Sequence, residues 1–95
     1  MAKMFEYKEV FFVVKSVRTW AYNEDLKMFV WIEKSHEDLT EYRTTKDDAN
    51  KDFENLGFSI NPNALVQCKD FIIHEKKWIR YIVQCRTIKE EFETI

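Results

Sequence analysis

Apolar side chains on both faces of the expected strands are the feature that most limits how this 95-residue chain can fold. Residues 26–33 alternate, with four aliphatic side chains on one face, yet Phe29 and Trp31 stand on the other. Residues 5–17 are also dominated by Phe, Val and Tyr, which favour strands over helices. Since one helix can cover only one side of a sheet, the second apolar face needs another cover.

One helix is clearly marked between the strand-rich segments. Thr45 is a favourable N-cap, and Asp47 and Asp48 follow in the first turn, where the helix dipole favours negative charge. The single glycine, Gly57, is placed to end the helix in a left-handed conformation. These signals predict a helix over about residues 46–56.

The order of the segments predicts the fold class. Residues 66–75 and 78–87 flank Lys76-Lys77 and suggest a hairpin, and residues 39–44 resemble an edge strand. We therefore expect one α+β domain over residues 1–95. Its mostly antiparallel sheet has five or six strands in the order β-β-β-α-β-β, and the helix packs on one face. The tail, residues 89–93, is compatible with a short helix, a strand end or a frayed end.

The hairpin register decides which side chains share a face. A two-residue turn would place Cys68 opposite Cys85, whereas a longer loop would shift the pairing. With the two-residue turn, the expected core face contains Leu26, Met28, Val30, Ile32, Ile72, Ile79, Tyr81 and Val83. The opposite face contains Phe11, Val13, Phe29, Trp31, Phe71, Ile73, Trp78 and Ile82.

Several large side chains on that second face would be costly to leave in water, at about 1.5–3 kcal/mol each. Three arrangements would bury them. The sheet could curl on itself, the face could be a homodimer interface, or it could receive a different partner.

The composition argues against several enzyme classes. Nucleotide-binding loops need two or three glycines at fixed spacing, and this chain has one. Ser16, Ser35 and Ser59 lack the flanking glycines of a nucleophile turn, and a Cys–His pair would have to come from the predicted core. We therefore predict no catalytic residues and a protein that is not an enzyme.

Metal, cofactor and membrane binding are also not expected. Cys68 and Cys85 are far apart in the sequence, unlike the close cysteine pairs of structural zinc sites. The longest apolar run is residues 10–14, much shorter than a membrane span or a signal peptide requires. We expect no metal, no small-molecule cofactor, no membrane partner and a cytoplasmic location.

The function that these patterns favour is that of a small non-catalytic binding or regulatory protein. It would act through the aromatic sheet face, either as a homodimer or on another protein. Trp, Tyr and Arg dominate the energetics of protein interfaces. The predicted partner-binding residues are Phe29, Trp31, Phe71, Trp78 and Arg80.

The alternative is a nucleic-acid-binding accessory protein that uses the basic, aromatic C-terminal hairpin. Its phosphate-binding residues would be Lys69, Lys76, Lys77 and Arg86, beside aromatic rings on which bases could stack. The overall net charge of −2 and the acidic tail argue against this alternative.

Overall fold

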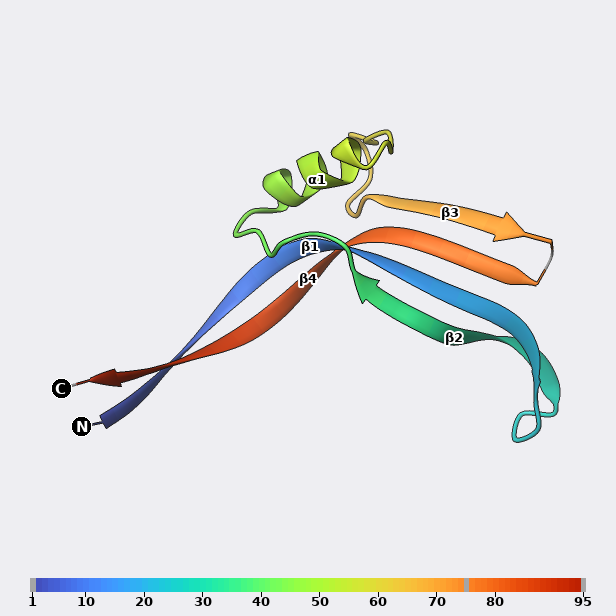
Figure 1. The fold of residues 1–95 in the computed structure, drawn as a ribbon, viewed down its shortest axis with the longest axis horizontal. Helices are drawn as coiled ribbons and strands as arrows, with labels where there is room; N and C mark the ends of the chain where they lie inside the picture. The colour runs from blue at the N-terminus through green and yellow to red at the C-terminus, as the bar shows by residue number, and fades with distance from the viewer. Residues whose placement is uncertain (1, 75, 95) are drawn as a thin grey trace.

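The computed structural model describes residues 2–74 and 76–94, which form a four-stranded antiparallel sheet with one helix on one face (Figure 1). The strands lie in the order β2-β1-β4-β3. Their bounds are β1 Ala2–Asn23, β2 Met28–Asp38, β3 Cys68–Ile73 and β4 Lys77–Thr94. The α+β class is confirmed, but the sheet has four strands where five or six were expected. The expected edge strand 39–44 contributes one isolated bridge, between Arg43 and Phe11.

The two central strands are much longer than their neighbours. β1 and β4 pair over almost their whole length, from Ala2 opposite Thr94 to Thr19 opposite Lys77. β2 pairs with β1 only from Val14 onward, and β3 accompanies β4 only as far as Ile82. Residues 2–9 and 87–94 therefore form a two-stranded extension, the terminal ribbon, at one end of the molecule (Figure 1). The tail that the sequence left undecided is part of β4.

The helix α1, Lys46–Asn55, begins and ends as the sequence predicts. The Thr45 hydroxyl accepts a hydrogen bond from the Asp48 amide at 3.2 Å, and Gly57 has a φ of 100°. The Phe58 ring lies 5.0 Å from that of Phe53, which is the hydrophobic contact that often accompanies such a helix end. Crossing a membrane would take a longer and more apolar helix than the described residues contain.

The core lies at the centre of the sheet and uses both of its faces. Val13 and Val83 pack beneath Ala49 and Phe53 of α1. On the other face, Val10, Phe12 and Val14 form a second buried cluster with Ile82 and Ile88. Part of its cover comes from the segment that follows β2 and from β4. The Tyr42 ring is 4.8 Å from the Phe12 ring, and the Arg86 guanidinium is 4.7 Å from the same ring.

The β3–β4 hairpin has a different register from the one expected for a two-residue turn. Cys68 pairs with Ile82, while Cys85 lies opposite Phe11, so both cysteines are free. The turn is longer than Lys76-Lys77: β3 ends at Ile73 and β4 begins at Lys77. Glu75, the last residue of the expected strand, lies outside the described residues.

The expected core face is therefore only partly correct. Ile79, Tyr81 and Val83 lie on the helix side, but the shifted register places Ile72 on the opposite face, where it is 67% exposed. Leu26 is 61% exposed because it belongs to the turn between β1 and β2 and not to a strand. The residues that the prediction missed are Phe12 and its neighbours on β1, which the structure buries completely.

A β-bulge interrupts the pairing of β1 with β2. Val17 lies opposite Ser35 and Arg18 lies opposite Glu33, so Lys34 has no partner residue in the ladder. An extra residue of this kind bends its strand and increases the local twist. Beyond the bulge, towards the turn, the pairing of β1 with β2 is regular again.

Candidate interaction surface

Five aromatic side chains gather on the sheet face that points away from the helix. Alternate residues of β1 share a face, so Trp20 and Tyr22 lie on the same side as Phe12. Their cross-strand partners on β2 are Trp31 and Phe29, respectively. With Trp78 of β4, these residues form a surface that we call the aromatic face: Trp20, Tyr22, Phe29, Trp31 and Trp78.

The rings of the aromatic face form a continuous series of contacts across three strands. Trp78 lies 5.5 Å from Trp31, and Trp31 lies 5.3 Å from Trp20, both with edge-to-face geometry. Trp20 stacks on Phe29 at 6.1 Å, and Phe29 meets Tyr22 at 5.5 Å. Such pairs each contribute about 0.5–1.5 kcal/mol beyond the area they bury. The rings therefore hold one another in place from the side.

Nothing in the described part of the chain covers this face as α1 covers the other. Trp20 is 44% exposed, Tyr22 52% and Phe29 53%. Phe12, on the same side of the sheet, is fully buried. Curling of the sheet, one of the three arrangements that would bury both apolar sets, is therefore not what the structure shows.

Two arginines and one aspartate border the rings. The guanidinium groups of Arg18 and Arg80 lie 5.2 and 4.5 Å from the centre of the Trp78 ring, within range of a cation–π interaction. Asp70 accepts two hydrogen bonds from Arg80, at 2.7 and 3.2 Å, and a third from the Trp78 indole nitrogen at 3.0 Å. Asp70 thus fixes both the orientation of the Trp78 ring and the position of the cation above it.

This hydrogen-bond network shifts the pKa values of Asp70 and Arg80. The hydrogen bonds from Arg80, and secondarily from Trp78, lower the pKa of Asp70, although partial burial opposes the shift. The bond to Asp70 raises the pKa of Arg80 in turn. Both groups are therefore charged at neutral pH.

Four of the five predicted partner-binding residues lie together on this face: Phe29, Trp31, Trp78 and Arg80. The fifth, Phe71, lies on the helix side. Its ring is 6.1 Å from Tyr81 and 6.3 Å from Phe58. The face assigned to Phe71 was wrong because the hairpin register was wrong.

Sequence reasoning missed Arg18, Trp20 and Tyr22. The sequence does carry a signal for them, because these three residues alternate along the chain directly before the turn at Asn23. A hairpin around that turn places Trp20 and Tyr22 opposite the aromatic residues at 31 and 29.

The residues of the nucleic-acid alternative do not share one face. Lys69 lies on the helix side, with its ammonium 5.6 Å from the Phe71 ring. Arg86 lies on the other side, where it donates to Asp38 at 3.3 Å. Lys76 and Lys77 are at the turn of the hairpin. The basic side chains are thus spread over both faces and the tip of the sheet.

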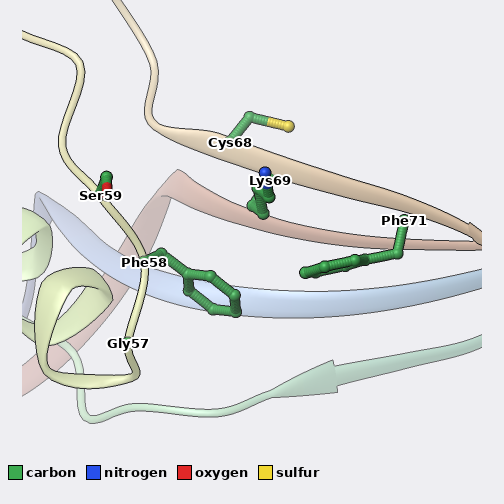
Figure 2. Close-up of a pocket in the computed structure, with 6 residues that line it drawn as sticks. All are labelled: Gly57, Phe58, Ser59, Cys68, Lys69 and Phe71. Atoms are coloured by element: carbon green, nitrogen blue, oxygen red, sulfur yellow. The ribbon is translucent and has the colours of Figure 1, made fainter.

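A hollow of about 430 Å³ lies between the end of α1 and β3, lined by Gly57, Phe58, Ser59, Cys68, Lys69 and Phe71. Figure 2 shows the Phe58 and Phe71 rings on one side of β3, while the Cys68 sulfur points away on the other. Partial burial, followed by the nearby Asp70 carboxylate, raises the pKa of the Cys68 thiol. A thiol in that state is a weak nucleophile.

Within residues 2–74 and 76–94, no group of three or more His, Cys, Asp or Glu side chains is arranged to hold a metal ion. Comparisons with protein-family models, curated proteins and solved structures gave no significant match to this chain. The function is therefore inferred from the geometry of the surface.

Proposed function

We propose that this chain is a small non-catalytic binding protein whose aromatic face associates with a protein surface. The observation that carries the proposal is a cluster of large rings that pack on one another, in which Trp20, Tyr22 and Phe29 stay about half exposed while Trp31 and Trp78 are partly buried. Trp, Tyr and Arg are the residues that contribute most at protein interfaces. The proposed location is the cytoplasm, where two free cysteines would stay reduced.

The charges around the rings favour a protein partner over a nucleic acid. Arg80 is paired with Asp70, so its charge is already compensated within the chain. Nucleic-acid binders align unpaired cations along a groove, because phosphate contacts supply most of the affinity. Here the lysines of the alternative lie on other surfaces. Bases that stacked on the aromatic rings would therefore find few cations nearby to contact their phosphates.

A photo-crosslinking side chain at position 29 tests the proposal. Phe29 is 53% exposed within the aromatic face, and Leu65 is 85% exposed on a loop away from it, so position 65 provides the matched control. We expect irradiation in source cells to yield a protein adduct from position 29 and not from position 65. Equal adducts at both positions would contradict the proposal, and an adduct that nuclease removes would support the nucleic-acid alternative.

Trp20→Glu provides a second test of the same surface. A charge at this half-exposed position should abolish association, while the circular dichroism spectrum stays that of the folded chain. Leu65→Glu adds the same charge to another exposed apolar position and should leave association unchanged. Loss of the folded spectrum in Trp20→Glu would show that the ring serves the core and not an interface.

A further inference from the structure

The chain exposes far more surface than a compact protein of its mass. Its solvent-accessible area is 7287 Å², whereas a folded monomer of 11.6 kDa exposes about 5,800 Å². The radius of gyration is 17.6 Å, against about 12 Å for a compact domain of this length. The excess area, about 1,500 Å², is more than the roughly 800 Å² that each partner contributes to a standard stable interface.

Part of this excess lies on the terminal ribbon. Four of its apolar side chains are exposed: Met4 53%, Phe5 49%, Tyr7 65% and Phe92 41%. A two-stranded ribbon is marginally stable in water unless another layer packs on it. Ion pairs of Lys8 with Glu90 at 2.6 Å and of Lys3 with Glu91 at 3.3 Å link the strands, and the Lys89 ammonium lies 3.9 Å from the centre of the Phe5 ring. The ribbon therefore has an apolar surface of its own that needs a cover.

The ribbon and the aromatic face cannot cover each other within one chain. They lie at opposite ends of a molecule 57 Å long (Figure 1). Eight residues of strand extend about 27 Å, so the ribbon accounts for about half of that length. Two chains side by side, running in opposite directions about a two-fold axis, would place each ribbon against the aromatic end of the other.

The charges of the two ends are complementary. The ribbon, residues 2–9 and 87–94, has three lysines and five glutamates, a net charge of −2. Beside the aromatic face, the guanidinium groups of Arg18 and Arg80 stand with the carboxylate of Asp70, a net charge of +1. Opposite charges on two joining surfaces favour the correct pairing. A second copy of the chain thus supplies an apolar surface and a net charge opposite to that beside the aromatic face.

We propose that the occupant of the aromatic face is the terminal ribbon of a second copy, exchanged reciprocally in a two-fold dimer. The inference rests on the proposed function and names the partner of the same surface. Phe5 and Tyr7, which share one side of the ribbon, contact the rings around Trp20 and Phe29. Both contacts of the dimer form at once, because a two-fold axis relates them.

Sedimentation equilibrium of the purified chain and of two variants tests this arrangement. The unchanged chain should be a dimer. Tyr7→Glu on the ribbon and Trp20→Glu on the aromatic face should each raise the dissociation constant by about 30-fold or more, as expected for central interface residues. Leu65→Glu should behave like the unchanged chain. Circular dichroism of each variant shows whether it is folded.

Mixing the two weakened variants distinguishes reciprocal exchange from other dimers. A mixed pair keeps one intact contact, between the ribbon of the Trp20→Glu chain and the face of the Tyr7→Glu chain. The equimolar mixture should therefore form more dimer than either variant alone. A Tyr7→Glu chain that dimerises normally, or a mixture that gains no dimer, would overturn the ribbon exchange.

The crosslinker at position 29 tests the proposed function separately from the dimer. A chain that stays monomeric, with a different protein attached at position 29, would overturn the ribbon dimer and leave the proposed function standing. A monomer with no protein adduct would overturn both. Adducts of the chain with itself, joined to ribbon residues, would support both.

Discussion

The centre of the sheet and its aromatic end are built from the same kinds of residue but differ in what lies above them. At the centre, Phe12 and Phe53 are 0% and 1% exposed. At the aromatic end, Trp20 and Phe29 remain about half exposed, although they lie on equally regular strands. Strand alternation therefore decides which face a side chain occupies, and the second layer decides whether it is buried.

The centre is also fastened by a contact that the aromatic end lacks. Arg43, in the segment between β2 and α1, donates to Asp52 of α1 at 2.7 and 3.1 Å. Its backbone pairs with Phe11 of β1. A single residue thus links the sheet edge, the connecting segment and the helix, which keeps the helix in place over Val13.

The largest expected effect separates these two regions directly. Phe53→Ala removes a ring that is 1% exposed, so it should lower the free energy of unfolding by about 3–5 kcal/mol. Phe29→Ala truncates the same residue type at the aromatic end, where the loss in the monomeric chain should be about 1 kcal/mol or less. Urea titration followed by circular dichroism measures both. Equal losses would mean that the two regions are stabilised alike.

A smaller effect is expected at the end of the helix. Gly57 has a φ of 100°, and an added β-carbon would meet no atom within 4 Å. Gly57→Ala should therefore cost about 1–2 kcal/mol through backbone strain alone. The measurement is the urea midpoint. A higher urea midpoint for Gly57→Ala would show that this residue adopts another backbone conformation in solution.

The N-cap should contribute about as much or slightly less. Thr45→Ala removes the hydroxyl that accepts from the Asp48 amide and should cost about 1 kcal/mol. Thr44→Ala, at the preceding exposed position, is the matched control and should have little effect. Thermal unfolding of the two variants compares them. If Thr44→Ala were the more damaging change, the helix would begin elsewhere.

The smallest effect concerns the aromatic end and depends on pH. Arg80, and secondarily Trp78, lower the pKa of Asp70 from its ordinary value of 3.8, so Asp70 stabilises the folded state most fully above about pH 4. That contribution is lost as the pH falls through the lowered pKa. The stability gap between the unchanged chain and Asp70→Asn should therefore be largest near neutral pH and shrink below about pH 4.

Urea titrations over that pH range measure the gap, with Asp25→Asn in the β1–β2 turn as the control. A gap between the unchanged chain and Asp70→Asn that does not change with pH would rule out the ionised carboxylate as the stabilising species. A shrinking gap that Asp25→Asn reproduces would assign the effect to overall charge and not to the contact with Arg80.

The parts of the fold that depend on residues close together in the sequence could be predicted. Thr45 and Gly57 mark the helix ends by local chemistry, and the structure places both where they were expected. The β3–β4 register could not be predicted in the same way. His74 adopts a φ of 53°, which lengthens the turn, and no residue in that segment requires this conformation.

The candidate surface was predicted only in part, because it also depends on where strands end and on how they pair. Trp31 and Trp78 were assigned to one face correctly, and the structure brings their rings together. Trp20 was missed because the first strand was expected to end near residue 17, whereas β1 continues to Asn23. The tail of β4 was undecided because its residues are mostly charged, and their pairing partners lie at the other end of the chain.

The bulge at Lys34 has a consequence for how the sheet edge beside the exposed rings can pair with other chains. β2 and β3 are the outer strands at the aromatic end of the sheet, and outer strands can recruit foreign strands through their free backbone groups. On β2 the unpaired Lys34 breaks the regular edge, and β3 offers only six residues. Irregular or short edges discourage edge-to-edge pairing of one sheet with the next. The aromatic face is thereby bordered by two strand edges that are poor templates for pairing with another chain.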